Sequence, residues 1–399
     1  MMRAVSKENM SLGLVLFNLF IAYLGIGLAV PVMPSIAKDM HLSGELVGYL
    51  ISAFAFAQLL ASPFTGVWVD RIGRKNMIVS GLFLFTVSEL LFGVGNQVWI
   101  LFLSRILGGV SEAFIMPAVI TYIADTTAPE NRAKILGYQA AAISSGFIIG
   151  PGLGGFIAEL GVRAPFFFAA GFAVVAALIS MLILQEPLSK EQMLSNRKMQ
   201  QRTSFLAEMK KSVQSFYFVP LLIVFVLSFG VAAYEMIYSL FVDLKFGFQA
   251  KDIAVIITVD SIFGVVAQIV FFEKLINRFG EKKVIQSSLV IAAIFILVTV
   301  FVSSYWAILA VTGIVFLSCD LLRPAVTTML TRMAGENQGF VAGMNSTYTS
   351  LGIIVGPAVS GSLIDVNIQY PYIFASIVLF AAFTMFVVWS RKKTVTSGR

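Results

Sequence analysis

Long stretches without charge are the feature that most restricts what this chain can fold into. No Asp, Glu, Lys or Arg occurs in six stretches, residues 9–37, 46–69, 135–158, 164–185, 337–364 and 366–390. One acid each interrupts residues 76–104, 106–124, 212–242 and 253–272, and residues 284–331 are long enough for two spans. About 20 apolar residues cross a bilayer as a helix, whose backbone groups hydrogen-bond internally. We therefore expect an all-α membrane protein with twelve transmembrane helices.

An internal repeat divides these spans into two sets. Landmarks of residues 137–168 return 206 positions later, so that Gly150, Pro151 and Gly155 correspond to Gly356, Pro357 and Gly361. A period of roughly 200 residues is far longer than the 20–50 residues of a solenoid repeat. The pattern predicts two pseudo-symmetric six-helix bundles, residues 1–186 and 214–399, joined by a polar cytoplasmic linker at residues 187–213, part of which could form an interfacial helix.

Basic residues indicate which way the spans run. If the chain starts inside and alternates, 22 of its 28 Lys and Arg fall inside. Four fall outside, Lys38, Arg163, Lys245 and Lys251, and two fall within spans, Arg105 and Arg323. Cytoplasmic loops carry an excess of Lys and Arg, so both termini are predicted to be cytoplasmic. The net charge of +7 is then a sorting signal and not a nucleic-acid footprint.

Ionisable residues inside the spans are the candidate functional groups. Each costs about 2.5–3.5 kcal/mol on insertion scales, so each needs a partner or a role. The acids outnumber the two arginines and are Glu89, Glu112, Glu235, Asp260 and Asp320. The excess negative charge suits a proton carrier or a cation site.

Structural roles remain open for several of these residues. Glu89 and Arg105 could pair or extend toward the membrane surface. Asp320 lies three residues before Arg323 and could form a salt bridge with it. Glu112 lies seven residues after Arg105, and either neutralises it or faces a cavity opposite Glu235 and Asp320.

Glycine and proline give further constraints. Gly146-x-x-x-Gly150 followed by Pro151 predicts close helix packing and a bend. The Gly-Pro-Gly-Leu-Gly-Gly run lacks the Gly-Lys-Ser or Gly-Lys-Thr of a phosphate loop, so nucleotide binding is not expected. Pro31 and Pro34 should bend or stop the first span, which we expect to line a cavity.

A single cysteine, Cys319, excludes a disulfide framework and any cysteine-based metal site.

Three motifs carry a resemblance to a known family. Gly66-x-x-x-Asp70-Arg71-x-Gly73-Arg74-Lys75, Arg105-x-x-x-Gly109 and the run from Gly146 to Gly155 are similar to signatures of the major facilitator superfamily. Within it, the third motif and the run LGIGLAVPVMP resemble the bacterial drug/proton antiporters of the NorA, Bmr and Blt type. The resemblance covers essentially the whole chain and implies the major facilitator fold. Glu112 and Asp260 depart from it, because the relatives have small or uncharged residues there.

This resemblance implies a transporter, not an enzyme, that works by alternating access around a central cavity. Its partners would be lipophilic drugs or cations, protons and membrane lipid, with no nucleic acid, no metal and no cofactor besides the coupling proton. The expected setting is a monomer in the bacterial cytoplasmic membrane.

The site residues follow from the resemblance and from the acids. Proton coupling is assigned to Glu235, Asp320 and Arg323. Substrate contact is assigned to Tyr23, Gln58, Glu112, Phe147, Tyr234, Tyr238 and Asn345. Conformational roles are assigned to Gly66, Asp70, Arg71, Gly73, Arg74, Arg105, Gly146, Gly150, Pro151, Gly154 and Gly155.

The predicted function is proton-coupled export of many lipophilic, often cationic compounds. An alternative keeps the fold but exports one neutral or zwitterionic metabolite, with the extra acids tuning protonation only. A more distant alternative is a membrane sensor or enzyme. The sequence disfavours that alternative, because it offers neither a nucleophile with a histidine base nor a metal-ligand cluster.

Overall fold

The computed structural model describes residues 2–189, 191, 193, 205–215, 217–334 and 337–396. Twelve helices in this part of the chain are long and apolar enough to cross a membrane. The prediction of an all-α membrane protein with twelve spans is therefore confirmed. Of the predicted linker 187–213, residues 190, 192 and 194–204 lie outside the described residues, and its end forms helix α9 (Phe205–Val213).

The chain forms two compact units. Unit 1 comprises Met1–His41, Ala53–Arg202 and Gln249–Val255, and unit 2 comprises Leu42–Ser52, Thr203–Phe248 and Ile256–Arg399. Two helices, α3 (Gly44–Ile72) and α11 (Ala250–Phe279), are thereby divided between the units.

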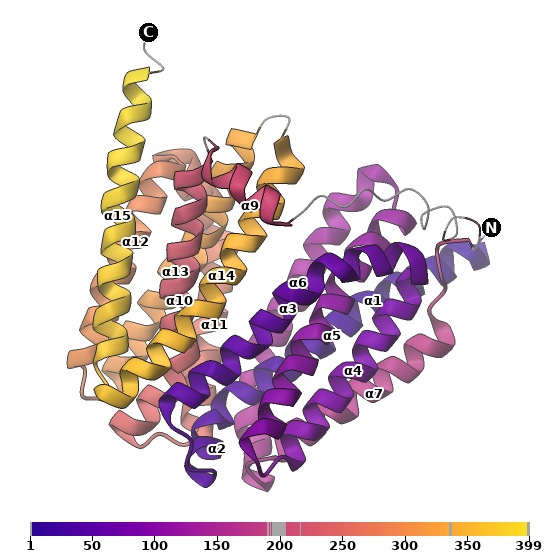
Figure 1. The fold of residues 1–399 in the computed structure, drawn as a ribbon, viewed down its shortest axis with the longest axis horizontal. Helices are drawn as coiled ribbons and strands as arrows, with labels where there is room; N and C mark the ends of the chain where they lie inside the picture. Colours follow the sequence, from indigo (N-terminus) through magenta and orange to yellow (C-terminus); the bar gives the residue numbers. More distant parts are fainter. Residues whose placement is uncertain are drawn as a thin grey trace. The chain divides into compact units, whose positions relative to one another are not determined.

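In unit 1, two helices, α1 (Met2–Ala29) and α4 (Arg74–Val94), make the largest contacts with other helices. Besides these helices and its part of α3, unit 1 contains α2 (Met33–Asp39), α5 (Val98–Thr126), α6 (Pro129–Ile157) and α7 (Ala164–Ile183), with short 3-10 turns η1 (Val30–Val32) and η2 (Ala158–Leu160). Helix α1 packs against α6 and α7, and α4 packs against α5 and α7 (Figure 1).

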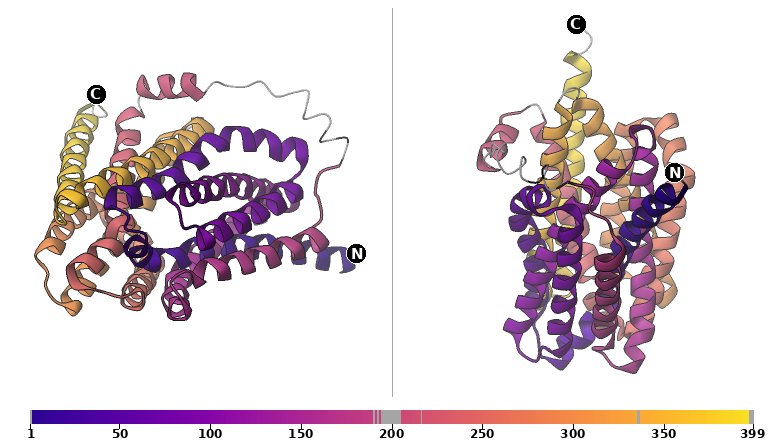
Figure 2. Two further views of the ribbon diagram at one scale, coloured as in Figure 1. Left: turned by 60° about the horizontal axis from the view of Figure 1, so that its bottom comes forward. Right: turned by 90° about the vertical axis from the view of Figure 1, so that its right-hand side faces the viewer.

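Unit 2 repeats this packing scheme. Its further helices are α10 (Phe218–Phe246), α12 (Glu281–Phe301), α13 (Tyr305–Ala334), α14 (Gln338–Val366) and α15 (Tyr370–Thr396). Helix α10 packs against α14 and α15, and α12 packs against α13 and α15, which can be followed from two other sides in Figure 2. Because α10 and α12 correspond to α1 and α4, the sequence repeat is also a repeat of helix contacts.

Glycines allow a close helix contact in each unit. A Cβ atom on Gly146, Gly150 or Gly154 would lie within 3 Å of the α1 backbone. In unit 2, Gly352 and Gly356 bring α14 equally close to the α10 backbone. The predicted close approach at Gly146 and Gly150 is therefore present. We call this contact between α6 and α1, which leaves no room for side chains, the glycine seam.

Proline interrupts the first span at the predicted place. Helix α1 ends at Ala29, the turn η1 contains Pro31, and α2 begins at Met33 with Pro34 in its first turn. Proline lacks the N–H that would continue the helical hydrogen bonds, so the break follows from the sequence.

Apolar side chains cover the outside of the units as well as their cores. Leu182, Ile269 and Phe301 are 83%, 77% and 77% exposed. A water-soluble protein rarely leaves so much large apolar surface open. Lipid tails are as apolar as these side chains, so such a surface fits a bilayer.

Candidate functional site

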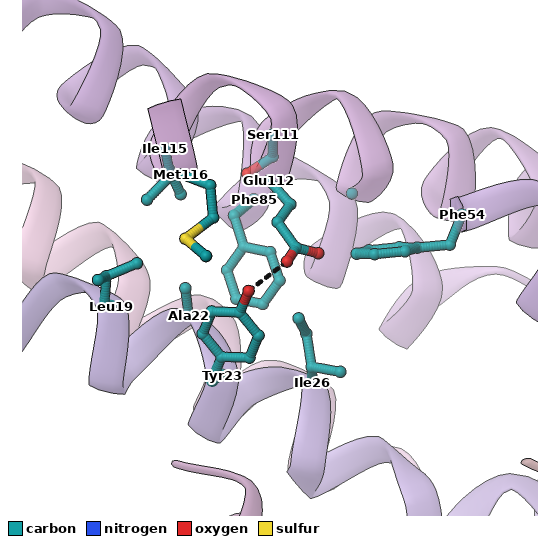
Figure 3. A pocket seen from close by; sticks show the side chains of 11 residues that line it. Leu19, Ala22, Tyr23, Ile26, Phe54, Phe85, Ser111, Glu112, Ile115 and Met116 are labelled. Atoms are coloured by element: carbon teal, nitrogen blue, oxygen red, sulfur yellow. Dashed lines mark hydrogen bonds between the residues drawn. The ribbon is translucent and has the colours of Figure 1, made fainter. Parts of the chain in front are cut away.

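A half-buried carboxylate marks a pocket in unit 1. The pocket is lined from α1, α3, α4 and α5, and Figure 3 shows Glu112 of α5 pointing into it toward Tyr23 of α1. The Tyr23 hydroxyl donates a hydrogen bond of 2.5 Å to Oε1 of Glu112. Phe54, Phe85 and other apolar side chains form the remaining wall. The pocket therefore combines one acid with an aromatic and aliphatic lining.

Two more predicted residues lie beside this acid. Gln58 of α3 lies close enough to the Glu112 carboxylate to interact with it. The Phe147 ring packs edge-on against Tyr23 with 5.0 Å between the ring centroids, and Phe147 itself is 41% exposed. The structure thus brings together four of the predicted substrate contacts, Tyr23, Gln58, Glu112 and Phe147.

The enclosed part of the pocket is small. Its volume is about 10 Å³, which is about the space that one water molecule needs. A drug-sized molecule would reach Glu112 only after the side chains around it moved aside.

Arg105 does not neutralise Glu112. Its guanidinium forms a salt bridge of 3.1 Å with Glu89 of α4, and it lies 4.3 Å from the centre of the Phe92 ring. The alternative in which Glu112 turns back to Arg105 is therefore wrong, and the pairing of Glu89 with Arg105 is confirmed. No salt bridge to Glu112 occurs among the described residues.

The motif between α3 and α4 forms a charged network. Arg74 is buried and forms salt bridges with Asp70, at 3.0 Å, and with Asp125 at the end of α5, at 2.8 Å. Arg71 is only partly buried, and its Nε atom has no hydrogen-bond partner among the described residues. Gly66 has open space around it. The network therefore centres on Arg74.

Gly73 and Glu186 complete the start of α4. Gly73 has φ of 104°, a conformation that favours glycine. The Glu186 carboxylate accepts hydrogen bonds from the backbone N–H groups of Arg74 and Lys75, at 3.0 and 2.9 Å. These are free donors of a helix N-terminus, where negative charge is favourable. A side chain on Gly73 would collide with this carboxylate.

An ion pair joins α10 to α13 in unit 2. Arg323 donates from Nη2 to both carboxylate oxygens of Glu235, at 3.0 and 2.9 Å. The Arg323 side chain is 51% exposed and that of Glu235 is 17% exposed, so the pair is partly open. The alternative in which Arg323 forms a salt bridge with Asp320 is wrong, because Arg323 is bound to Glu235.

Asp320 faces α11. A Cβ atom built on Gly264 would lie 2.0 Å from Oδ2 of Asp320, so glycine is what leaves room for this side chain. Asp320 is partly buried, one helical turn from Arg323. Of the three predicted coupling residues, Arg323 therefore contacts Glu235 and lies one helical turn from Asp320. The group contains one cation and two acids.

Two predicted substrate contacts lie elsewhere. Tyr234 and Tyr238 are 1% and 0% exposed, and both hydrogen-bond to Thr312 of α13. Tyr234 also packs against the Tyr372 ring. The prediction that these tyrosines contact substrate is corrected, since both belong to the core of unit 2. Asn345 is half-buried on α14.

Three contributors were not foreseen from the sequence. Asp125 and Glu186 hold the start of α4, and Thr312 links the two buried tyrosines. Glu186 follows the uncharged stretch 164–185, and Asp125 follows the stretch 106–124, which one acid interrupts. This position at the end of a span is the signal that could have identified them. Thr312 carries no such signal in an apolar segment.

Comparison with known proteins gives the family. Residues 15–271 and 221–399 match the model of the Major Facilitator Superfamily. "Multidrug resistance protein 2" of Bacillus subtilis is 52% identical over 98% of both chains. "Multidrug resistance protein 1" of the same organism is 49% identical, over 96% of this chain and 97% of the relative. "Quinolone resistance protein NorA" of Staphylococcus aureus is 40% identical, over 91% and 92%.

Solved structures support the same fold. A bacterial homologue of the human lysosomal transporter Spinster superposes with a TM-score of 0.80 at 14% identity, over 96% of this chain and 97% of that one. The nucleoside transporter NupG gives 0.75 at 14% identity, over 94% and 99%. The expectation of a transporter instead of an enzyme is confirmed. This chain belongs to the major facilitator superfamily, in the family that includes NorA and the two Bacillus multidrug resistance proteins.

Proposed function

We propose that this protein exports lipophilic, often cationic drugs across the bacterial cytoplasmic membrane in exchange for protons. The observation that carries the proposal is Glu112, a half-buried carboxylate without a salt bridge among the described residues. Aromatic rings and Gln58 lie beside it. A positive charge next to a carboxylate and aromatic rings gains from both. The names of the relatives, two multidrug resistance proteins and a quinolone resistance protein, agree with this role.

Exchange follows from the cost of an uncompensated charge in the membrane. When a cationic drug occupies the site, the Glu112 carboxylate is neutralised by the drug. When the drug has left, an uncompensated carboxylate is costly in the membrane, so drug release and proton uptake by the coupling residues have to occur in the same cycle. Tyr23 lowers this cost, because its hydroxyl donates a hydrogen bond to the empty Glu112 carboxylate.

Coupling in unit 2 is assigned to Glu235, Asp320 and Arg323. One guanidinium can compensate one carboxylate, and Arg323 is engaged by Glu235. Asp320 is then the acid that lacks a cation of its own and can take up a proton. All of these groups belong to one chain, so we propose that a monomer suffices for transport.

The orientation and the division into halves are part of the same proposal. We place both termini in the cytoplasm, because that choice puts most of the 28 Lys and Arg on the inner side. We take residues 1–186 and 214–399 as the two halves whose rocking exposes the site alternately, with residues 187–213 as their linker.

Transport of a fluorescent cation into inverted vesicles tests the function. We expect accumulation that requires a proton gradient and ends when the gradient is collapsed. Accumulation that is indifferent to the gradient would rule out proton coupling.

A charge-selective variant tests the role of Glu112. Glu112→Gln keeps the size of the side chain but removes its charge, so export of cationic drugs should fall much more than export of neutral ones. Glu273→Gln is the matched control, since Glu273 is an exposed acid at the end of α11 and should leave both unchanged. An equal loss for both drug classes would instead favour a structural Glu112 or a neutral substrate.

A further inference from the structure

Asp260 is a buried acid that the proposed exchange does not use. It lies in α11 within unit 2 and is 2% exposed. Its Oδ2 atom is buried and has no hydrogen-bond partner among the described residues, and no salt bridge to Asp260 occurs among them. A carboxylate in this position would keep its charge with neither a cation nor a full set of hydrogen bonds.

The side chain is held in the contact between α11 and α13. A Cβ atom built on Gly313 of α13 would lie 3.1 Å from Oδ1 of Asp260. One turn further along α11, Gly264 makes the corresponding room for Asp320 of α13. Each of the two helices therefore has a glycine that leaves room for an aspartate side chain of the other helix. Asp260 is the more deeply buried of the two acids.

Hydroxyl groups from α10 and α13 lie near Asp260. Tyr234 donates to Thr312 at 3.3 Å, and Thr312 donates to the Tyr238 hydroxyl at 3.1 Å. Asp260 interacts electrostatically with both tyrosines. These tyrosines are the titratable groups that face it from α10.

The remaining titratable and charged groups of this region lie farther along α13 or on α15, and Asp320 lies against Gly264, one turn from Asp260 on α11. On α13, Cys319, Asp320 and Arg323 follow Gly313 by six, seven and ten residues, and Arg323 is bound to Glu235 of α10. Tyr372 of α15 packs against Tyr234. Among the described residues, Asp260 thus has hydroxyl neighbours but no salt-bridged cation.

We propose that Asp260 is a second proton-binding group of this transporter, protonated in the arrangement described here and deprotonated once per transport cycle. The inference rests on the proposed proton-coupled export. A buried carboxyl group without a cation is most stable when it is neutral. In the release step its O–H bond breaks, the proton passes to water, and the carboxylate remains. A tyrosine hydroxyl that turns toward the carboxylate can then donate a hydrogen bond, which lowers the cost of that state.

A second proton changes the electrical balance of transport. One proton exchanged for a monovalent cation moves no net charge, whereas two protons move one positive charge inward for each cation exported. The membrane potential acts on net charge that crosses the membrane. The wild-type protein should therefore transport a monovalent cation when driven by the potential alone.

Reconstituted full-length protein in vesicles tests this prediction with a fluorescent monovalent cation. A potassium gradient with an ionophore supplies a potential without a pH difference, and a pH jump supplies the reverse. We expect Asp260→Asn to lose transport driven by the potential and to keep transport driven by the pH gradient. Potential-driven transport that survives in Asp260→Asn, or is absent from a wild type that responds to pH, would overturn the inference. A wild type that responds to neither force would refute proton coupling itself.

A second variant keeps the test decisive if Asp260→Asn does not fold. Thr312→Val retains the acid but removes the hydroxyl that links the two tyrosines, so potential-driven transport should slow. Ser318→Ala is the control, because Ser318 is a buried hydroxyl on the same helix whose one hydrogen bond among the described residues goes to the backbone carbonyl of Ile314. Equal rates in the two variants would count against a role for the hydroxyl groups around Asp260.

Proton release on drug binding in detergent gives an independent count of the protons exchanged. Asp260→Asn should release one proton fewer than the wild type.

Discussion

Replacing Gly150 by alanine should open the seam between α6 and α1. A Cβ atom at this position would lie 2.7 Å from the Leu24 carbonyl oxygen and 2.8 Å from Cα of Gly27. The first contact is about 0.7 Å shorter than the 3.4 Å at which ordinary contacts begin. Both neighbours are backbone atoms, which cannot turn away as a side chain can. The helices must therefore separate along their closest contact.

Gly137 on the same helix is the matched control. Nothing lies within 4 Å of a Cβ atom built there. Both substitutions change helix propensity alike, by about 1 kcal/mol in favour of alanine. The difference between the two variants is then the overpacking cost alone, which is about 1–3 kcal/mol. We expect Gly150→Ala to be less stable than Gly137→Ala by this amount.

Thermal unfolding in detergent and transport in vesicles measure the two consequences. Gly150→Ala should unfold at a lower temperature than Gly137→Ala and transport more slowly, and Gly150→Leu should still bind drug but lose transport. Binding should persist because Gly150 does not line the Glu112 pocket. Equal unfolding temperatures for the two alanine variants, or normal transport by Gly150→Leu, would refute the view that backbone contact at this seam matters.

Two further predictions concern charged contacts. Arg323→Gln should reduce the stability of unit 2 more than Glu235→Gln/Arg323→Gln does, because the single change leaves a partly buried carboxylate without its cation. Removing one partner of a fully buried pair costs about 3–5 kcal/mol. Unfolding of the wild type and the two variants measures the difference, and a double variant no more stable than the single one would contradict the prediction. Gly73→Ala should destabilise the protein by about 1 kcal/mol or more, since the residue has positive φ and no room beside Glu186. Gly66→Ala should instead stabilise it by up to about 1 kcal/mol, because Gly66 lies inside α3 with open space around it. Identical unfolding temperatures would contradict this reasoning.

The spans and the repeat could be predicted from the sequence because the bilayer imposes them. A helix in hydrocarbon must be long and nearly uncharged, and this requirement is visible residue by residue. The seam at Gly146 and Gly150 was predictable for a similar reason, since small residues one turn apart have few uses other than close packing.

Partner choice among charged side chains was not predictable in the same way. Arg323 has Asp320 one turn away on its own helix but binds Glu235 of α10, 88 residues away in the sequence. Which acid it meets depends on how α13 is rotated against α10. The pairing of Arg105 with Glu89, in preference to Glu112, depends on the contact of α4 with α5 in the same way.

The tyrosines beside Glu235 show how much one residue of helix rotation matters. Neighbouring positions on a helix point about 100° apart. Glu235 therefore reaches Arg323 at a partly open position, while Tyr234 enters the core of unit 2. Proximity in sequence to a functional acid did not make the tyrosines part of an accessible site.

The glycine seam also bears on how a protein of this kind can diverge. Gly146, Gly150 and Gly154 leave no room for any side chain, so these positions are closed to substitution as long as α1 and α6 touch. The walls around Glu112 are made of aliphatic, aromatic and methionine side chains, such as Ile115 and Met116. Apolar positions accept exchanges of similar volume at low cost. Descendants of this sequence can therefore vary the lining of the Glu112 pocket, and with it the substrates under the proposed function, while inheriting the glycine framework unaltered.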